Sequence, residues 1–393
     1  MLYFSNLKVL AIVDFGLVEH SGGYQRNLEM MRRLPSYLDM DIVPSLRNVR
    51  LALNGHRDEL LSILRDLGAW SSLDAVREAS SEEEFTQRLN RDKYDMALVY
   101  SNSGENVELA SKLTSSPVGV QLQLEPFYRD LSTLFRIKFR GPTGRALDRF
   151  QRAVQESRRE ERTWLSLIRA RKLNFTISVS RVPLAYSGLN GLIPYDVTIP
   201  GNAIDPGIRR FRREKEDYAV YFTRLIPEKG LFDVPLIWKK VNERRDMRLY
   251  VMGQFLDEKD EEDFMRLIQR LNVNVEYLGF KTGRDLYEMV AGAQFTLYPS
   301  HYDSFSLVVL ESLALNTPVV AYDTPAIREV YQGVKGVSTV EEDNLTGMAS
   351  LCLKQGEVNV IFPEIYSSWD KVALAEIESI NKMAKTFSLP GVY

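Results

Sequence analysis

The sequence predicts an α/β protein built around two doubly wound parallel sheets. Short apolar runs typical of buried strands alternate along the chain with segments of helical spacing, as in parallel sheets that are covered by helices. A chain of 393 residues is also too long for one ordinary hydrophobic core, so we expect two domains. A charged stretch without apolar periodicity, residues 206–216, separates the two series of strands, and we place the linker there.

The first series opens with a strand at 8–13, a loop, and a helix that follows Gly22-Gly23. Its further strands are expected at 40–44, 96–100, 118–123, 175–179 and 196–199. Strands of the second series are expected at 218–222, 248–252, 275–278, 295–298 and 318–321, and a last helix at 369–388. The predicted division is an N-terminal domain, 1–205, the linker, a C-terminal domain, 217–368, and a helical tail, 369–393.

Composition and charge exclude several classes of protein. With a formal net charge of -3 the chain lacks the basic field of a general nucleic-acid binder. A single cysteine, Cys352, excludes an internal disulfide framework and a cysteine-based metal cage. No apolar run approaches the roughly 20 residues of a spanning helix, and residues 1–13 lack the features of a signal peptide. We expect a cytoplasmic protein, at most peripheral on the inner face of the membrane.

The most informative motif follows the strand expected at 295–298. It contains Asp303, Ser304, Phe305, Ser306, Leu307 and Glu311. Open α/β sheets bind ligands at the carboxyl ends of their strands, which makes this loop a candidate site. Its two carboxylates can accept hydrogen bonds from sugar hydroxyls, and its backbone N–H groups can face an anionic or hydroxyl-rich ligand. The structural alternative is an Asp that caps a helix and a Glu in a buried polar contact.

A second motif, residues 221–230, follows the strand at 218–222. It brings Arg224 and Lys229 to one loop, five positions apart, ahead of a helix that starts near Gly230. Two fixed cations at this spacing suit a diphosphate. Each residue alone has a simpler interpretation as a solvated surface charge.

Together the two motifs resemble the retaining nucleotide-sugar glycosyltransferases of family 4, which have the GT-B fold of two Rossmann-like domains facing across a cleft. The family signature is a Glu, seven residues and a second Glu, usually within Glu-Gly-Phe-Gly-Leu. Here Asp303 stands for the first Glu, Ser304 and Ser306 for the glycines, and Glu311 for the second Glu. A further departure is Asn316, where the family usually has glycine.

The resemblance implies a role for each motif. Residues 223–230 contain the family's Gly-Arg-Leu and Glu-Lys-Gly patterns, with Thr in place of the first glycine. In this interpretation Arg224 and Lys229 bind the donor's diphosphate, Asp303 binds the sugar hydroxyls, and Glu311 binds the nucleotide ribose. Negative charge develops on the departing diphosphate, so cations placed there stabilise the transition state more than the ground state. No metal and no cofactor is required.

Gly22 and Gly23 match the family's Gly-Gly loop, which implies that they bind the donor. Without a Cβ, their backbone can approach a phosphate at a helix N-terminus. A flexible loop with a helix cap is the structural alternative. Arg26, one turn into this helix, is either a third cation or a solvated charge.

Four further residues are candidates for the acceptor side or the cleft wall: Gln123, Glu125, Asn202 and His301. Gln123 takes the place of a histidine that is common in the family, and it cannot move protons near neutral pH. A retaining transfer of the front-side type needs no protein base, because the departing phosphate oxygen can take the acceptor's proton. His20 is another candidate for the wall, although a lone histidine is usually structural.

Residues 129–172 carry thirteen basic and five acidic side chains, a net charge of +8, with apolar residues interleaved. Such a segment can rest on an anionic bilayer and give access to a lipid-linked acceptor. The alternative is a solvated helical face whose apolar side packs on the domain.

We therefore expect a retaining, metal-independent hexosyltransferase with an acceptor-side N-terminal domain and a donor-binding C-terminal domain. Its partners would be a nucleoside-diphosphate sugar, a hydroxyl acceptor and, through 129–172, an anionic membrane surface. The resemblance also implies that the helical tail crosses back toward the first domain. The competing hypothesis is a non-catalytic nucleotide-sugar-binding or scaffold protein derived from such an enzyme.

Overall fold

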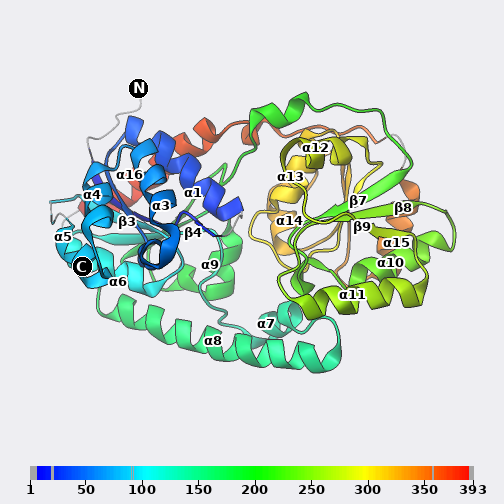
Figure 1. Ribbon diagram of the computed structural model, residues 1–393, viewed down its shortest axis with the longest axis horizontal. Helices are drawn as coiled ribbons and strands as arrows, with labels where there is room; N and C mark the ends of the chain where they lie inside the picture. Colours follow the sequence, from blue (N-terminus) through cyan, green and yellow to red (C-terminus); the bar gives the residue numbers. More distant parts are fainter. Residues whose placement is uncertain (1–6, 19–21, 90, 92, 356–357, 389–393) are drawn as a thin grey trace. The chain divides into compact units, whose positions relative to one another are not determined.

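Two parallel six-stranded sheets dominate the computed structural model, and they confirm the predicted α/β class (Figure 1). The structure describes residues 7–18, 22–89, 91, 93–355 and 358–388. The chain divides into two compact units, each built around one sheet. Unit 1 comprises 1–129, 156–202 and 369–393, and unit 2 comprises 130–155 and 203–368.

The sheet of unit 1 has the strand order β2-β1-β3-β4-β5-β6. Its strands are β1 (Lys8–Val13), β2 (Asp39–Pro44), β3 (Met96–Tyr100), β4 (Val118–Leu122), β5 (Phe175–Ser178) and β6 (Tyr195–Val197). The inner strand β3 is buried along its whole length, whereas Tyr195 of the edge strand β6 is exposed. This difference explains why the inner strands are nearly continuous apolar runs in the sequence.

The helices of unit 1 are α1 (Gly22–Arg33), α2 (Leu46–Leu51), α3 (Arg57–Asp66), α4 (Trp70–Glu78), α5 (Glu82–Arg88), α6 (Gly104–Leu113), α9 (Arg181–Ser187) and α16 (Trp369–Ser388). Helix α16 lies beside α1 (Figure 1). The contact contains a buried ion pair between Arg26 and Glu376, and the Tyr100 hydroxyl donates to Glu376 Oε1 at 2.7 Å. Because separating a buried ion pair leaves a charge without a counterion in the interior, this pair favours the contact between α1 and α16.

The sheet of unit 2 has the order β12-β11-β10-β7-β8-β9. Its strands are β7 (Tyr218–Phe222), β8 (Arg248–Met252), β9 (Val275–Tyr277), β10 (Thr296–Tyr298), β11 (Val319–Tyr322) and β12 (Val337–Val340). The helices within it are α7 (Leu131–Lys138), α10 (Asp233–Asn242), α11 (Glu258–Leu271), α12 (Gly283–Gly292), α13 (Leu307–Ala314), α14 (Pro325–Tyr331) and α15 (Leu345–Lys354). Two 3-10 turns, η4 (Pro206–Arg210) and η5 (Pro227–Lys229), complete the part that positions the site.

Alternate residues of β7 feed two hydrophobic clusters, one on each face of the sheet. Ala219 and Tyr221 belong to the cluster that contains Trp238. Val220 and Phe222 belong to the other. Because side chains alternate along a strand, both faces of β7 are covered by apolar groups, as expected for a central parallel strand.

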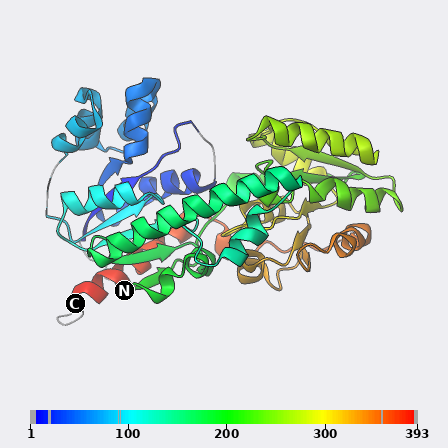
Figure 2. The ribbon, with the colours of Figure 1, turned by 90° about the horizontal axis from the view of Figure 1, so that it is seen from below.

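Helix α8 (Thr143–Arg169) is one long helix, and Figure 2 shows it without interruption. Its residues 143–155 belong to unit 2 and its residues 156–169 to unit 1. The sequence-based division placed all of 130–155 in the first domain, whereas the structure places this segment in unit 2. Within unit 2 this segment contributes both ion pairs and buried apolar side chains. Arg149 pairs with Asp260 at 3.0 Å and Lys138 with Glu228 at 2.6 Å, while Leu134 and Ile137 are buried.

Candidate functional site

The candidate site of unit 2 lies at the point where the strand order reverses. Strands β8 and β9 lie on one side of β7, and the chain then returns so that β10 lies on the other side. The loops after β7 and β10 therefore meet at a topological switch point, where open α/β sheets bind ligands. These loops, residues 223–230 and 299–306, are the two motifs that the sequence singled out.

The two loops pack backbone against backbone. Gly230 adopts φ +77°, and a Cβ built on it would overlap the carbonyl oxygen of Pro299. His301 N donates to Glu228 O at 2.9 Å. Only glycine allows both this left-handed conformation and this close approach, so the Glu-Lys-Gly sequence is what brings the loops together.

Lys229 and Asp303 form the central ion pair of the site. Lys229 is buried, and its Nζ donates to Asp303 Oδ2 at 2.7 Å and to Tyr302 O at 2.9 Å. Burial lowers the pKa of Lys229, while the Asp303 carboxylate opposes that shift and the nearby charge of Arg224 adds to it. The structure thus brings together three of the predicted residues, Arg224, Lys229 and Asp303.

Asp303 is held from a second side by Tyr298, whose hydroxyl donates to the same carboxylate oxygen. Burial and the Asp303 charge together keep the pKa of Tyr298 well above its ordinary value, so the hydroxyl remains a donor. Asp303 is therefore fixed before any ligand arrives. Arg224 differs: it is exposed, and its guanidinium has no ion-pair partner among the residues that the structure describes.

The turn between Asp303 and α13 has an unusual backbone. Ser306 adopts φ +67°, a left-handed conformation, and its carbonyl accepts a hydrogen bond from Tyr331 Oη at 2.9 Å. Phe305 is buried and packs edge-on against Tyr331 and Tyr366, so its ring belongs to the core and not to a ligand surface. Ser304 is also buried, and Leu307 begins α13 half-buried.

Glu311 lies in the second turn of α13 and is half-buried. Within the described part of the chain its carboxylate has no hydrogen-bond or ion-pair partner, and burial raises its pKa to about 7. Its charge contributes to raising the pKa of Tyr287 to about 12, after burial. Burial holds the pKa of Tyr331 well above its ordinary value, and the charges of Asp303 and Glu311 add to that shift.

His301 is placed differently from the expected wall residue. It is 1% exposed, and both ring nitrogens contact carboxylates, Nε2 that of Asp233 at 2.9 Å and Nδ1 that of Glu342 at 2.8 Å. Ligand atoms of Asp233, His301 and Asp343 lie within 4.8 Å of one another, close enough to hold a cation. Arg140 already pairs with Asp343, however, and supplies positive charge there.

The remaining candidates lie in unit 1. Gly22 and Gly23 open α1, both half-buried. Gln123 Nε2 donates to Asn27 Oδ1 at 2.5 Å, and Asn27 in turn donates to the carbonyl oxygens at the ends of β1 and β3. Gln123 thus braces the edge where the strands of unit 1 end. Glu125 is half-buried two residues further along.

Asn202 is buried, and its Oδ1 has no hydrogen-bond partner among the described residues. Arg26 is neither a third cation for a ligand nor a solvated charge, because it is fully buried in its pair with Glu376. His20 lies outside the residues that the structure describes. Sequence reasoning missed Asp233, Tyr298 and Glu342, since no local pattern distinguishes them from other polar residues.

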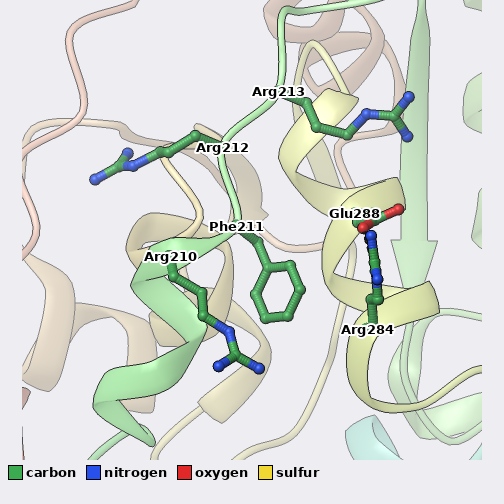
Figure 3. Close-up of a pocket in the computed structure, with 6 residues that line it drawn as sticks. All are labelled: Arg210, Phe211, Arg212, Arg213, Arg284 and Glu288. Atoms are coloured by element: carbon green, nitrogen blue, oxygen red, sulfur yellow. Dashed lines mark hydrogen bonds and ion pairs between the residues drawn. The ribbon is translucent and has the colours of Figure 1, made fainter.

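A hollow of about 540 Å³ in unit 2 is lined by Arg210, Phe211, Arg212, Arg213, Arg284 and Glu288. Figure 3 shows Arg212 and Arg213 directed to opposite sides of the chain, while Arg284 turns to Glu288, its partner at 2.6 Å. The guanidinium groups do not converge on one point, so this hollow offers no cradle for a single anion.

The basic segment 129–172 is only partly a solvated face. Its first part pairs with acids of unit 2 through Arg136, Lys138, Arg140, Arg145 and Arg149. Of the interleaved apolar side chains, Leu134, Ile137, Trp164 and Leu167 are buried, whereas Leu131 and Phe135 are exposed. None of the helices that the structure describes is both long and apolar enough to cross a membrane.

Solved structures share this architecture. A structure of HepE from Anabaena in complex with UDP and glucose is 16% identical, covers 97% of this chain and 99% of its own, and gives a TM-score of 0.58. The lipopolysaccharide outer core galactosyltransferase WaaB is 12% identical, with coverages of 98% and 100% and a TM-score of 0.56. This chain has the GT-B fold. At these identities the likeness shows the fold alone.

Comparison of sequences finds a similarity to glycosyltransferases over part of the chain. Residues 208–346, which contain both loops of the site, match the model of glycosyl transferases group 1. An uncharacterized glycosyltransferase of Methanocaldococcus jannaschii is 28% identical over 164 residues, which is 40% of this chain and 40% of that protein. The O-antigen chain mannosyltransferase B of Escherichia coli is 22% identical over 182 residues, 46% and 44%. The chain thus matches less than half the length of either relative.

Proposed function

We propose that this protein is a retaining glycosyltransferase that moves a hexosyl group from a nucleoside-diphosphate sugar to a hydroxyl acceptor without a bound metal. The observation that carries the proposal is the arrangement of Arg224, Lys229 and Asp303 at the switch point of unit 2. The match of residues 208–346 to group 1 glycosyl transferases and the UDP in the HepE structure support it.

The electrostatics of the site suit a departing diphosphate. Lys229 is already fixed by Asp303 and Tyr302, so its charge needs no reorganisation during the reaction. Arg224 is exposed and can pair with the phosphate groups. As the bond from the anomeric carbon to the phosphate oxygen breaks, both cations stabilise the growing negative charge, which is the part a metal ion plays in other sites.

The carboxylates hold the rest of the donor in this proposal. Asp303 accepts hydrogen bonds from sugar hydroxyls with the oxygen that Lys229 and Tyr298 leave free. Within the described part of the chain the Glu311 carboxylate has no hydrogen-bond or ion-pair partner. In this proposal it accepts hydrogen bonds from the two ribose hydroxyls. Gln123 cannot act as a base, which agrees with a front-side transfer in which the leaving phosphate oxygen takes the acceptor's proton.

The test is the loss of turnover on removing each cation. We expect Arg224→Ala and Lys229→Ala to lower kcat by about 10²-fold or more, as for a lost oxyanion donor. The matched controls are Arg270→Ala and Lys239→Ala, which remove exposed cations from helices of the same unit. Full turnover in both site variants, with intact melting curves, would refute the assignment.

The non-catalytic alternative predicts a different pair of results. A binding or scaffold protein would show a rise in melting temperature with UDP-, GDP- or ADP-sugars, because a ligand of the native state stabilises it. It would not hydrolyse the donor slowly in the absence of an acceptor, whereas the enzyme would. The same screen identifies the donor base.

We also propose a peripheral contact with anionic lipid, limited to the exposed cations that lie further along the basic segment: Arg152, Arg158, Arg159, Arg162, Arg169 and Arg171. With Trp164 and Leu167 buried, this contact would rest on charge alone and would weaken with salt. Flotation with anionic vesicles at low and high salt tests it. Failure to bind at low salt removes the membrane from the proposal.

A further inference from the structure

His301 is enclosed by acceptors. Its side chain is fully buried, with Asp233 Oδ2 at 2.9 Å from Nε2 and Glu342 Oε1 at 2.8 Å from Nδ1. A neutral imidazole has one N–H donor and one lone pair, and an ionised carboxylate can only accept. Two ionised partners are therefore satisfied only by an imidazolium, which donates from both nitrogens.

The charges around His301 agree with this. Three carboxylates face it, Asp233 from α10 and the neighbouring Glu342 and Asp343 after β12. Two guanidinium groups face the same acids, since Arg136 pairs with Glu342 and Arg140 pairs with both Glu342 and Asp343. Tyr322 contributes a neutral hydroxyl, which donates to Asp233 Oδ2 at 2.9 Å. With His301 as an imidazolium, the three carboxylates are balanced by three positive charges, those of the two arginines and the histidine.

The histidine is directly connected to the loops of the site. Its N–H donates to Glu228 O at 2.9 Å, next to Lys229 in the first loop. Its carbonyl accepts from Arg136 Nη1 at 3.4 Å. The following residues, Tyr302 and Asp303, are the two acceptors of Lys229 Nζ. Whatever fixes His301 therefore fixes the donor-binding ion pair.

We propose that His301 is a positioning residue, an imidazolium that donates to Asp233 and Glu342 and thereby holds the loop of Asp303 against the loop of Lys229. Burial alone lowers the pKa of His301, but its hydrogen bonds to Asp233 and Glu342 raise it by more, so the net shift is upward. The link to catalysis rests on the proposed function, whereas the charge state of the ring does not.

The charge state is measured first, on the complete chain labelled with ¹⁵N-histidine. The sequence has only three histidines, so the variants His56→Gln and His301→Gln assign the spectrum. His56 is the matched control, a histidine beside a carboxylate, Glu59, at an exposed site of unit 1. We expect His301 to show two protonated nitrogens at pH 7.5, and the His56 signal in the same spectrum serves as the reference for a histidine at an exposed site. A neutral His301 tautomer at pH 7.5 would overturn the proposal.

The positioning role is measured by pH profiles. Deprotonation at high pH removes one of the two donors, so we expect the wild type to lose donor turnover as pH rises through the pKa of His301. Glu342→Gln removes one of the charges that favour the imidazolium and should move this loss to lower pH. His301→Gln should lower kcat by about 10²-fold, the cost of misplacing a group by about 1 Å, and should flatten that limb of the profile. His56→Gln should change neither.

Two results would contradict the role even if the ring is an imidazolium. One is an unchanged pH profile in both Glu342→Gln and His301→Gln. The other is a Zn²⁺-dependent rise in melting temperature that His301→Gln abolishes, which would make Asp233, His301 and Asp343 a metal site. If Arg224→Ala and Lys229→Ala keep full turnover, the proposed function fails, and the nitrogen spectrum still decides whether His301 is the predicted cation.

Discussion

Two residues of unit 2 adopt a backbone conformation that glycine favours. Ser306 and Asn316 both have a left-handed backbone, with φ of +67° and +59°. Both stand at positions where the resemblance to family 4 led us to expect glycine. This conformation costs about 1–2 kcal/mol of strain at a non-glycine residue.

Replacing Ser306 by glycine should affect stability differently from replacing Ser304. In Ser306→Gly the relief of strain is offset by the greater freedom of glycine in the unfolded chain, so we expect the free energy of unfolding to change by less than about 1 kcal/mol. Ser304, which is buried and has no left-handed φ, gains no such relief. Ser304→Gly should cost about 1 kcal/mol. Chemical denaturation of both variants measures this, and equal losses would show that the backbone at 306 is not strained.

Glu311 makes a second prediction at this scale. Its pKa of about 7 means that the native state favours the neutral acid, so it contributes stability below its unfolded pKa that is lost as pH rises through 7. Glu311→Gln should therefore stabilise the free protein at pH 8.5, by at most about 3 kcal/mol.

Glu311→Gln should also weaken UDP binding at pH 8.5, because an ionised carboxylate accepts hydrogen bonds from the ribose hydroxyls more strongly than an amide does. Isothermal titration calorimetry at pH 6 and 8.5 measures the difference. The exposed Glu262→Gln is the control. If Glu311→Gln lowered stability at pH 8.5, the carboxylate would have a structural partner that the described residues do not reveal.

At the scale of elements, the site depends on the contact between the loops after β7 and β10. Alanine substitution at two glycines distinguishes the energetic cost of a left-handed backbone from the cost of disturbing the contact between the loops. Gly230 and Gly279 have φ of +77° and +76°, but a Cβ at Gly279 meets no atom within 4 Å, whereas one at Gly230 overlaps Pro299 O.

Gly279→Ala should thus cost only the backbone term, about 1–2 kcal/mol. Gly230→Ala should cost a further 1–3 kcal/mol or so, typical of overpacking, and should reduce donor affinity because the loops separate. Denaturant unfolding and UDP titration of both variants check this. Equal losses of stability would mean that the loops give way without strain.

The sequence predicted most elements of the sheets and few of the contacts between them. Strand β7 was expected at 218–222 and lies there, because a buried parallel strand is a continuous apolar run. Strand β12 was missed, because Val337–Val340 is a partly exposed edge strand whose pattern is weak. The site shows the same limit: Arg224, Lys229 and Asp303 stand in local motifs, whereas Lys138 and Glu228 pair across 90 positions.

At the scale of the whole molecule, neither unit is a continuous stretch of chain. Residues 130–155 belong to unit 2 and form ion pairs with its acidic residues. Helix α16 belongs to unit 1, where Glu376 pairs with Arg26. A linear division of the sequence cannot represent either exchange, because each is decided by tertiary contacts and not by composition. Each unit therefore depends on partners that lie far away in the sequence.

Breaking the ion pair between Arg26 and Glu376 tests how strongly unit 1 depends on α16. Glu376→Ala leaves the Arg26 guanidinium buried without its counterion, which should cost about 3–5 kcal/mol. Glu378→Ala, on an exposed position of the same helix, should change stability by less than about 0.5 kcal/mol. Because a single melting temperature is poorly defined for two units, hydrogen exchange is the appropriate measurement.

We expect peptides from β3 and β4 to lose protection in Glu376→Ala, while peptides from β7 and β10 keep theirs. The reason is that the buried pair stabilises the interior of unit 1 and has no counterpart in the hydrophobic clusters of unit 2. Equal loss of protection in both sheets would show that the units unfold as one cooperative body. In that case α16 would stabilise the whole molecule, and the candidate site of unit 2 would depend on a helix that belongs to unit 1.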